Sequence, residues 1–314
     1  HSYSTFYYTL TYIKLTLEQK LLVCDIFVTI CEEVFMSVKV LDCTLRDGAY
    51  VVDGKFSDEN IAEIKTTLDK ANIDIIECGW LRDCKHEKDS VFYNIPEDMS
   101  GIIRKNKYSL MFDYGRYDIS KLPQNTGSVD IIRIAFYKKS LDEISFAAEK
   151  VKSKGYEVFL QPSNVKEYTK TELEKLCKRA NYIGVNACYI VDSFGSLFPE
   201  DLEKIIPIFS ENLEENILLG FHSHNNIQLS LALSIQFINS IERDIVVDST
   251  LCGIGRGGGN TKTELLTEYL NRFREGRYDI RAINELAKNT IEPLGYSWEY
   301  TLEKGQKGLN NLHP

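Results

Sequence analysis

Short apolar runs rich in β-branched residues alternate with longer amphipathic stretches along most of this 314-residue chain. Each run ends in a polar turn, after which apolar residues recur at helical spacing until the next run begins. Such runs are typical of buried strands, and a repeat of roughly 25 residues is typical of βαβ units. The eight runs are Lys39–Asp42, Asp74–Cys78, Tyr108–Phe112, Asp130–Ala135, Glu157–Leu160, Tyr182–Asn186 with a continuation to Asp192, Ile217–Phe221 and Asp244–Asp248.

The amphipathic stretches between these runs predict helices that cover a parallel sheet. Eight strand–helix units favour a closed (β/α)8 TIM barrel over an open doubly wound sheet. The first run is not followed by Gly-x-Gly-x-x-Gly, so the sequence does not support a dinucleotide-binding fold. The predicted helices are Asp58–Lys70, Leu141–Lys154, Thr171–Ala180, Asp201–Asn212, Leu229–Ile241 and, after the last run, Thr263–Phe273.

Both ends of the chain fall outside this repeat. Residues 21–31 are apolar but short, contain Asp25 and lack a basic region and a small-residue cleavage site, so a signal peptide is not expected. We expect residues 1–35 to be an extension outside the fold and residues 36–275 to form the barrel. Residues 276–314 are expected to be a short helical C-terminal extension; they end without a closing feature, a pattern consistent with truncation.

Composition narrows the class of protein. The formal net charge is −9, and the Lys and Arg residues are scattered among acids, so the sequence offers no basic face for nucleic acid. No stretch approaches the roughly 18 apolar residues of a membrane span. The eight cysteines form no CxxC pair, which favours reduced thiols in a cytoplasmic protein.

The pair His222-Ser-His224 lies at the end of the seventh predicted strand, and active sites of such barrels lie at strand ends. Alternate residues of a strand point to one face, so both imidazoles are expected to bind a divalent cation together. Asp47, after the first strand, is the expected third ligand because the eighth strand closes the barrel between the first and the seventh. Taken singly, the histidines also fit satisfied polar residues, and Asp47 fits a turn cap beside Gly48.

Two further strand ends bring polar groups to this candidate metal site. Arg46 offers a fixed cation and a planar donor fork where negative charge develops. Glu77 on the neighbouring strand is placed to orient Arg46 by a charge-assisted hydrogen bond, although a purely structural ion pair fits the same residues. The run Gly253–Asn260 leads into a helix and offers backbone N–H groups to a carboxylate or phosphate, although an ordinary flexible loop fits equally well.

These motifs, in this order at the strand ends, resemble the DRE-TIM metallolyase superfamily over about residues 38–270. That group includes 4-hydroxy-2-oxovalerate aldolase, hydroxymethylglutaryl-CoA lyase, and the isopropylmalate and homocitrate synthases. The resemblance implies that Arg46 stabilises an enolate oxygen and that Glu77 is the acid of the Asp-Arg-Glu signature. The implied metal ligands are Asp47, His222, His224 and Asn260. The candidate substrate-binding residues are Arg133, Asp192, Arg256, Gly257 and Gly258.

The segment Leu41–Phe56 and the tail Asn310–Pro314 resemble the aldolase-type branch of this superfamily, and Gly48-Ala49-Tyr50 replaces the Gly-Glu-Gln that is usual in the acyl-CoA synthases. Tyr50 stands where the hydroxyoxovalerate aldolases carry an acid/base histidine, so it is a candidate proton relay, although a packing role fits equally well. The Gly-rich loop has Arg256-Gly257 in place of the cysteine of the hydroxymethylglutaryl-CoA lyases, which disfavours that activity. Arg256 is expected to meet an anionic group of the substrate.

The resemblance implies a lyase that cleaves or forms a C–C bond of a 4-hydroxy-2-oxo acid through an enolate, with Mn²⁺ or Mg²⁺ preferred and Co²⁺ or Zn²⁺ as alternatives. One alternative is a Claisen-type acyl transferase that uses acetyl-CoA. Another is a barrel without catalysis that serves as a partner subunit. Aldolases of the hydroxyoxovalerate type pair with an aldehyde dehydrogenase, so such a partner is a weaker expectation, and a homo-oligomer is typical of these barrels.

Overall fold

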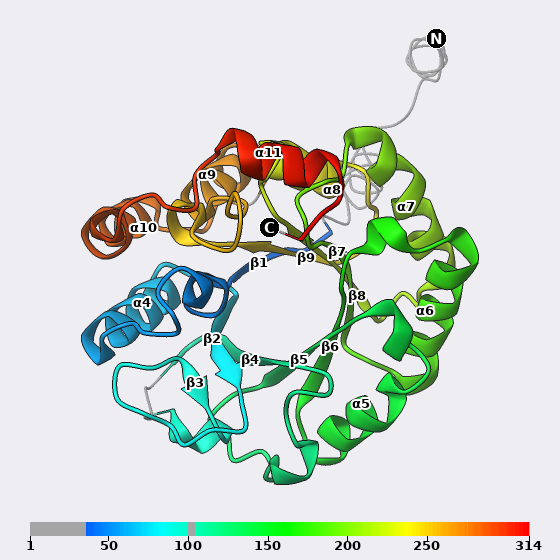
Figure 1. Ribbon diagram of the computed structural model, residues 1–314, viewed down its shortest axis with the longest axis horizontal. Helices are drawn as coiled ribbons and strands as arrows, with labels where there is room; N and C mark the ends of the chain where they lie inside the picture. The colour runs from blue at the N-terminus through cyan, green and yellow to red at the C-terminus, as the bar shows by residue number, and fades with distance from the viewer. Residues whose placement is uncertain (1–35, 100–103, 275, 314) are drawn as a thin grey trace, which may run out of the picture. The chain divides into compact units, whose positions relative to one another are not determined.

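The computed structural model describes residues 36–99, 104–274 and 276–313; the predicted extension of residues 1–35 lies outside this range. Eight parallel strands close into a barrel because β1 pairs with both β9 and β2 (Figure 1). The short strand β3 (Phe92–Tyr93) pairs with the end of β2. The prediction of a (β/α)8 barrel is confirmed. The barrel strands are β1 (Val38–Asp42), β2 (Ile75–Leu81), β4 (Lys107–Asp113), β5 (Ile131–Phe136), β6 (Glu157–Pro162), β7 (Ala187–Asp192), β8 (Leu218–Ser223) and β9 (Ile245–Ser249).

Side chains along the strands alternate between the barrel interior and the layer under the helices. On β7, Tyr189 lies in the interior cluster, whereas its neighbours Cys188 and Ile190 belong to the larger cluster outside it. This alternation follows from the pleat of a strand, and both faces are buried because helices cover the outer one. The interior apolar residues are Leu41, Cys43, Ile75, Ile131, Phe159, Ala187, Tyr189, Val191 and Val246.

Six of the strands are followed by an α-helix that packs on the outside of the barrel (Figure 1). The described parts of the β2–β4 and β4–β5 connections hold only β3 and the single 3₁₀ turns Pro96–Asp98 and Ile119–Lys121. The described parts of these two connections are therefore mostly loop, in contrast to the helical connections of the other strands. The six helices are α4 (Asp58–Lys70), α5 (Ile144–Ser153), α6 (Lys170–Ile183), α7 (Pro199–Asn212), α8 (Ser230–Asn239) and α9 (Thr263–Phe273).

The predicted strand over Tyr182–Asn186, with its continuation to Asp192, is wrong in its first five residues and right in the continuation. Tyr182 and Ile183 are the last residues of α6, and the strand begins only at Ala187. The cause is local: Thr169 and Glu172 form a capping box at the start of α6, and Gly184 ends the helix in the left-handed conformation at φ 63°. The apolar run thus combined a helix end with a strand start.

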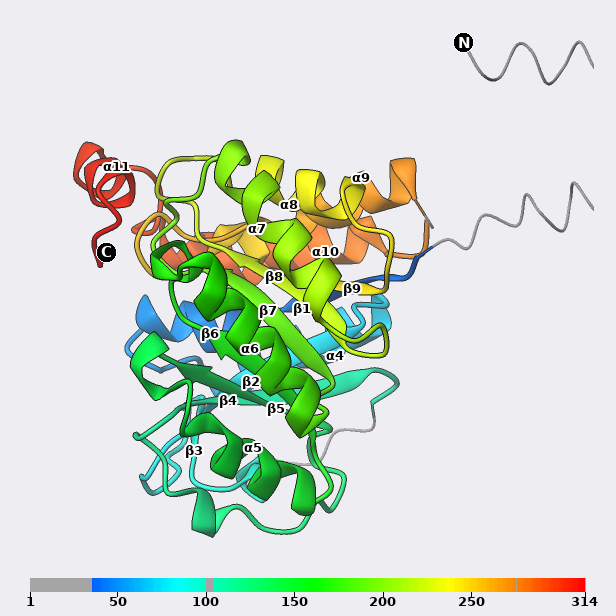
Figure 2. The ribbon, with the colours of Figure 1, turned by 90° about the vertical axis from the view of Figure 1, so that its right-hand side faces the viewer.

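The C-terminal residues add helices α10 (Ile280–Leu286) and α11 (Leu302–Leu309). Helix α11 lies at the end of the barrel where the strands finish (Figure 2). Its Gly308 approaches the loops after β7 and β8 so closely that a Cβ atom would lie 2.8 Å from the Asn226 Cβ. The chain after α11 consequently reaches the barrel mouth.

The structure bears on two of the expectations from composition. The helices of the described residues include none that is long and apolar enough to cross a membrane. The six cysteines within the described ranges are free thiols, as the absence of CxxC spacing predicts.

Candidate active site and metal centre

A cavity of about 350 Å³ opens at the end of the barrel where the strands finish. Its wall combines the ends of barrel strands with the Gly-rich loop after β9 and the segment after α11. This is the end at which the active sites of such barrels lie. The predicted site residues in the wall are Arg46, Asp47, Tyr50, His222, His224 and Arg256.

Two imidazoles and one carboxylate converge in this wall. His222 Nε2 lies 3.3 Å from His224 Nε2. His224 Nε2 lies 3.9 Å from Asp47 Oδ2. One potential ligand atom of each residue lies within 4.8 Å of the other two, and all three side chains are buried. The structure thus brings together the three ligands that the sequence predicts.

The ionisation states of these side chains fit a divalent cation. Burial lowers the pKa of His224 to about 3, so its imidazole is neutral, as a metal ligand must be. Burial opposes ionisation of Asp47, but the Arg46 guanidinium outweighs it, with help from the Asn260 hydrogen bond, and holds the pKa of this carboxyl well below its usual range. The Asn260 amide donates to Asp47, whereas its buried Oδ1 has no hydrogen-bond partner among the described residues. That oxygen is a suitable fourth donor.

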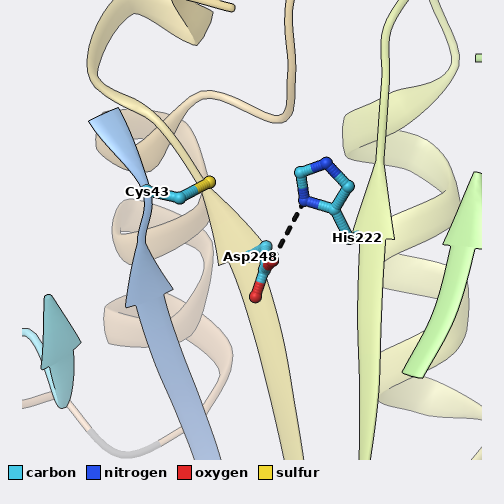
Figure 3. Close-up of side chains that lie close together, drawn as sticks. All are labelled: Cys43, His222 and Asp248. Atoms are coloured by element: carbon cyan, nitrogen blue, oxygen red, sulfur yellow. Dashed lines mark ion pairs between the residues drawn. The ribbon is translucent and has the colours of Figure 1, made fainter. Parts of the chain in front are cut away.

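A second group around His222 also has the spacing of a metal site. Cys43, His222 and Asp248 offer ligand atoms within 4.8 Å of one another, and the His222 ring points toward Asp248 (Figure 3). However, burial raises the pKa of the Cys43 thiol well above its usual value, and the thiol donates to the Ser249 carbonyl at 3.4 Å. Because a metal binds the thiolate, this group fits a cation less well than Asp47, His222 and His224.

His222 is oriented by a carboxylate behind it. Its Nδ1 lies 3.0 Å from Asp248 Oδ2, near enough for an ion pair although off line for a hydrogen bond (Figure 3). The other ring nitrogen, Nε2, faces His224 and the cavity. A carboxylate next to the ring nitrogen that faces away from the cavity orients a histidine ligand, so Asp248 is placed to orient His222 toward a cation.

A buried ionic chain extends beneath the cavity. Arg46 Nε donates to Glu77 Oε2 at 2.7 Å, and Arg46 Nη1 donates to Asp47 Oδ1 at 2.7 Å. Arg133 Nη1 donates to the same Glu77 oxygen at 2.8 Å, and its Nη2 donates to Asp248. These five side chains and His222, which is linked to them through Asp248, are each at most 5% exposed. Each charge is therefore held by a neighbour of opposite sign.

Tyr50 lies at the mouth of the cavity and packs edge-on against Trp80, with ring centroids 5.7 Å apart. The Arg256 guanidinium lies over the Tyr50 ring at 5.3 Å. Burial raises the pKa of Tyr50, with the Arg256 charge opposing the shift, so the phenol is protonated at neutral pH. Arg256 also meets His313 at 3.2 Å, which brings the C-terminal segment into the site.

Four predicted substrate-binding residues do not line the cavity. Arg133 is fully buried beneath it, between Glu77 and Asp248. The Asp192 carboxylate accepts backbone N–H groups of the following loop, from Ser196 at 2.8 Å and from Leu197 at 3.2 Å, and burial raises its pKa to about 6. Arg133 and Asp192 therefore support the residues and the loop that surround the cavity, and they do not line it as predicted.

Gly257 and Gly258 pack behind the site. Gly257 has a left-handed φ of 65°, and Gly258 donates to the Asn226 side chain. A Cβ atom on Gly258 would lie 2.8 Å from the Asn226 backbone, so the loop needs glycine for close packing. Arg256, between this glycine pair and the cavity, is the loop residue that reaches the wall.

Sequence reasoning missed a group of polar residues on the far side of the cavity. They follow or end β4, β5 and β6, where a reading of strand ends could have found them, but they belong to no motif. His313 was missed because its position depends on the path of the chain after α11. The missed wall residues include Asp113, Tyr114, Tyr137, Gln161, Ser163 and His313.

The fold and the site define a barrel with a two-histidine, one-carboxylate centre at its mouth. Residues 134–288 match the HMGL-like family. This match and the similar proteins named below confirm the resemblance to the DRE-TIM superfamily that the motifs indicate.

Relatives with assigned activities are similar over most of the chain. An oxaloacetate decarboxylase from Mycobacterium tuberculosis is 27% identical and the match covers 87% of this chain and 83% of that protein. A 4-hydroxy-2-oxovalerate aldolase from Geobacillus genomosp. 3 is 28% identical, with 82% and 78% covered. Among solved structures, the N-terminal domain of an aldolase-like protein from Bacteroides vulgatus has 28% identity and a TM-score of 0.76, with 88% and 93% covered.

Proposed function

We propose that this protein is a divalent-metal-dependent aldolase-type lyase that cleaves, or forms, the C3–C4 bond of a 4-hydroxy-2-oxo acid. The observation that carries the proposal is the convergence of Asp47, His222 and His224 with the Arg46 guanidinium in one cavity wall. Relatives named 4-hydroxy-2-oxovalerate aldolase and oxaloacetate decarboxylase support it, because both names describe scission of the C3–C4 bond of a 2-oxo acid, which leaves an enolate at C2 and C3.

Asp47, His222, His224 and Asn260 would hold the cation, which supplies electrophilic activation of a 2-oxo acid when bound. Arg46 is fixed by Glu77 and Asp47, each at 2.7 Å, so its charge is held in the cavity wall, where it would stabilise the negative oxygen of an enolate. Glu77 does not line the cavity and acts through Arg46 as a positioning residue. Arg133 holds the other side of Glu77 and so extends this support.

The reaction requires two proton transfers. The C4 hydroxyl loses its proton, the C3–C4 bond breaks, and its electron pair passes to C3 to give the enolate and an aldehyde. The enolate then takes a proton at C3 and becomes the 2-oxo acid product. Tyr50 lines the cavity and is protonated at neutral pH because burial raises its pKa, so we assign it the donation of a proton rather than the first abstraction.

The first experiment measures bound metal by elemental analysis in the wild type, His222→Ala and a matched control, His86→Ala. His86 stacks on Tyr93 at 4.9 Å and is absent from the cavity wall. We expect about one Mn²⁺, Mg²⁺, Co²⁺ or Zn²⁺ per chain in the wild type and in His86→Ala, and a loss of at least tenfold in affinity for His222→Ala.

A cleavage screen follows with 4-hydroxy-2-oxo acids and oxaloacetate, in the presence and absence of chelator. Metal-dependent release of a 2-oxo acid supports the proposal. If neither wild type nor control binds a cation at millimolar concentration, the proposal is refuted and a non-catalytic partner subunit becomes the better account. Release of free CoA from acetyl-CoA with a 2-oxo acid would instead favour the Claisen-type transferase.

A further inference from the structure

We propose that the substrate carries a hydroxylated chain beyond its 2-oxo acid head, and that Gln161 and Asp113 recognise it. This inference rests on the proposed function and names the substrate class of the same site. It follows from the side of the cavity that the proposed chemistry leaves unused.

The cavity has two chemically different sides. The candidate metal ligands come from the ends of β1 and β8 and from the loop after β9. In the strand order of the barrel, β4, β5 and β6 lie on the opposite side (Figure 1). Pyruvate is the smallest 2-oxo acid with an enolisable methyl group. Held at the β1–β8 side, it would leave the β4–β6 side to the rest of a longer substrate.

Gln161 is a hydrogen-bond donor without a protein partner on that side. It occupies an inward position of β6, two residues after Phe159 of the interior cluster, and is only 3% exposed. Its Nε2 is buried and has no hydrogen-bond partner among the described residues, yet the residue lines the cavity. Because buried amide groups are normally paired, a ligand oxygen is the partner that this position fits.

Asp113, at the end of β4, supplies a hydrogen-bond acceptor, whereas Gln161 supplies a donor. Its carboxylate accepts from Arg82 Nη1 at 3.0 Å and lies 3.8 Å from Arg116 Nη1. Arg82 is in turn stacked over the Trp80 ring at 4.3 Å. The two guanidinium groups favour the charged form of the Asp113 carboxyl, and its remaining lone pairs can accept a hydrogen bond from a ligand hydroxyl.

A donor and an acceptor on one wall match hydroxyl groups, since a hydroxyl both accepts from an amide and donates to a carboxylate. Tyr114, Tyr137 and Ser163 add further hydroxyl groups to this wall. A methyl-ended chain, by contrast, would leave the Gln161 amide unpaired. The wall therefore favours a polyhydroxylated, sugar-acid-like 4-hydroxy-2-oxo acid, whose cleavage gives a hydroxyaldehyde.

The test compares two aldehydes of equal carbon number in the condensation direction with pyruvate: glyceraldehyde and propanal. The variants are Gln161→Met, which keeps length and removes the amide, and the control Gln236→Met on α8, whose amide donates to Pro199 outside the cavity. We expect the wild type and the control to prefer glyceraldehyde by at least about tenfold in kcat/KM. We expect Gln161→Met to lower that preference by about tenfold.

Metal-dependent exchange of the pyruvate methyl hydrogens with deuterated water is measured alongside, because it reports enolate formation without any aldehyde. If exchange occurs but the wild type shows no preference for glyceraldehyde, or Gln161→Met slows both aldehydes equally, this inference is overturned and the proposed function stands. If exchange is absent with every metal, the proposed function fails and the inference falls with it.

Discussion

Arg133 offers the sharpest test of the buried ionic chain. The change is Arg133→Met, which keeps the volume of the side chain and removes the guanidinium that joins Glu77 to Asp248. Both carboxylates stay in the barrel interior, where they are 0% and 1% exposed. Glu77 retains Arg46, but Asp248 keeps only His222 as an ionic neighbour among the described residues.

Removing one partner of a buried ion pair costs about 3–5 kcal/mol, because an uncompensated charge remains in a medium of low polarity. We therefore expect urea denaturation at pH 8 to show a loss of about 3–5 kcal/mol in the free energy of unfolding. Burial opposes ionisation of Asp248, but Arg133 and His222 hold its pKa below the usual range in the wild type. In the variant, burial prevails and the pKa of Asp248 rises.

The sign of the pH dependence follows from this rise. A lowered carboxyl pKa stabilises the folded protein above the unfolded-state pKa, and this contribution disappears as acid protonates the group. The difference between wild type and Arg133→Met should thus be largest at pH 8 and shrink toward pH 4. The double variant Arg133→Met, Asp248→Leu should lose less than the sum of the single losses. A loss below about 1 kcal/mol at both pH values, or additive losses, would refute the argument.

Two further results are expected. Burial raises the pKa of Asp42 to about 6 against hydrogen bonds from Thr263 and Thr44, so the folded protein binds a proton more tightly than the unfolded chain. This bound proton contributes its whole stabilisation below about pH 4, and the contribution is lost as the pH rises to about 6. The free energy of unfolding should be measured at several pH values for wild type and Asp42→Asn. Between pH 4 and pH 7 the value for Asp42→Asn should rise by up to about 3 kcal/mol relative to that of wild type. A difference that does not change with pH would contradict this prediction. Separately, Tyr50→Phe should lower kcat by about 10²–10⁴ if the phenol donates a proton, with an unchanged melting temperature. An unchanged kcat would leave Tyr50 a packing residue against Trp80.

The fold was predictable because its elements are locally specified. Helices α4 and α9 have the predicted bounds, Asp58–Lys70 and Thr263–Phe273, since each amphipathic stretch is bounded by polar turns. The boundary near Gly184 was not predictable from hydrophobicity alone, because a buried helix end and a buried strand start form one apolar run. The helix ends there because Gly184 adopts the left-handed backbone conformation, and hydrophobic periodicity does not reveal this.

The site was predictable where a motif and a strand end coincide. His222, His224 and Asp47 meet because the closed barrel brings the ends of β8 and β1 to one mouth. The role of Arg133 beneath the cavity was not predictable, because facing inward does not reveal depth along the barrel axis. The polar residues of the cavity wall around Gln161 were missed for another reason. Their residue types are common, and only their proximity in the folded chain distinguishes them from other polar residues at strand ends.

The buried ionic chain has a consequence for the order in which ligands bind. Its two guanidinium groups, Arg46 and Arg133, face three carboxylates, Asp47, Glu77 and Asp248, which leaves an excess of one negative charge. A divalent cation reverses this excess to one positive charge, which a monoanionic acid then neutralises. The negative excess of this ionic chain thus favours binding of the cation before the acid, while Arg256 in the cavity wall offers the acid a separate positive charge.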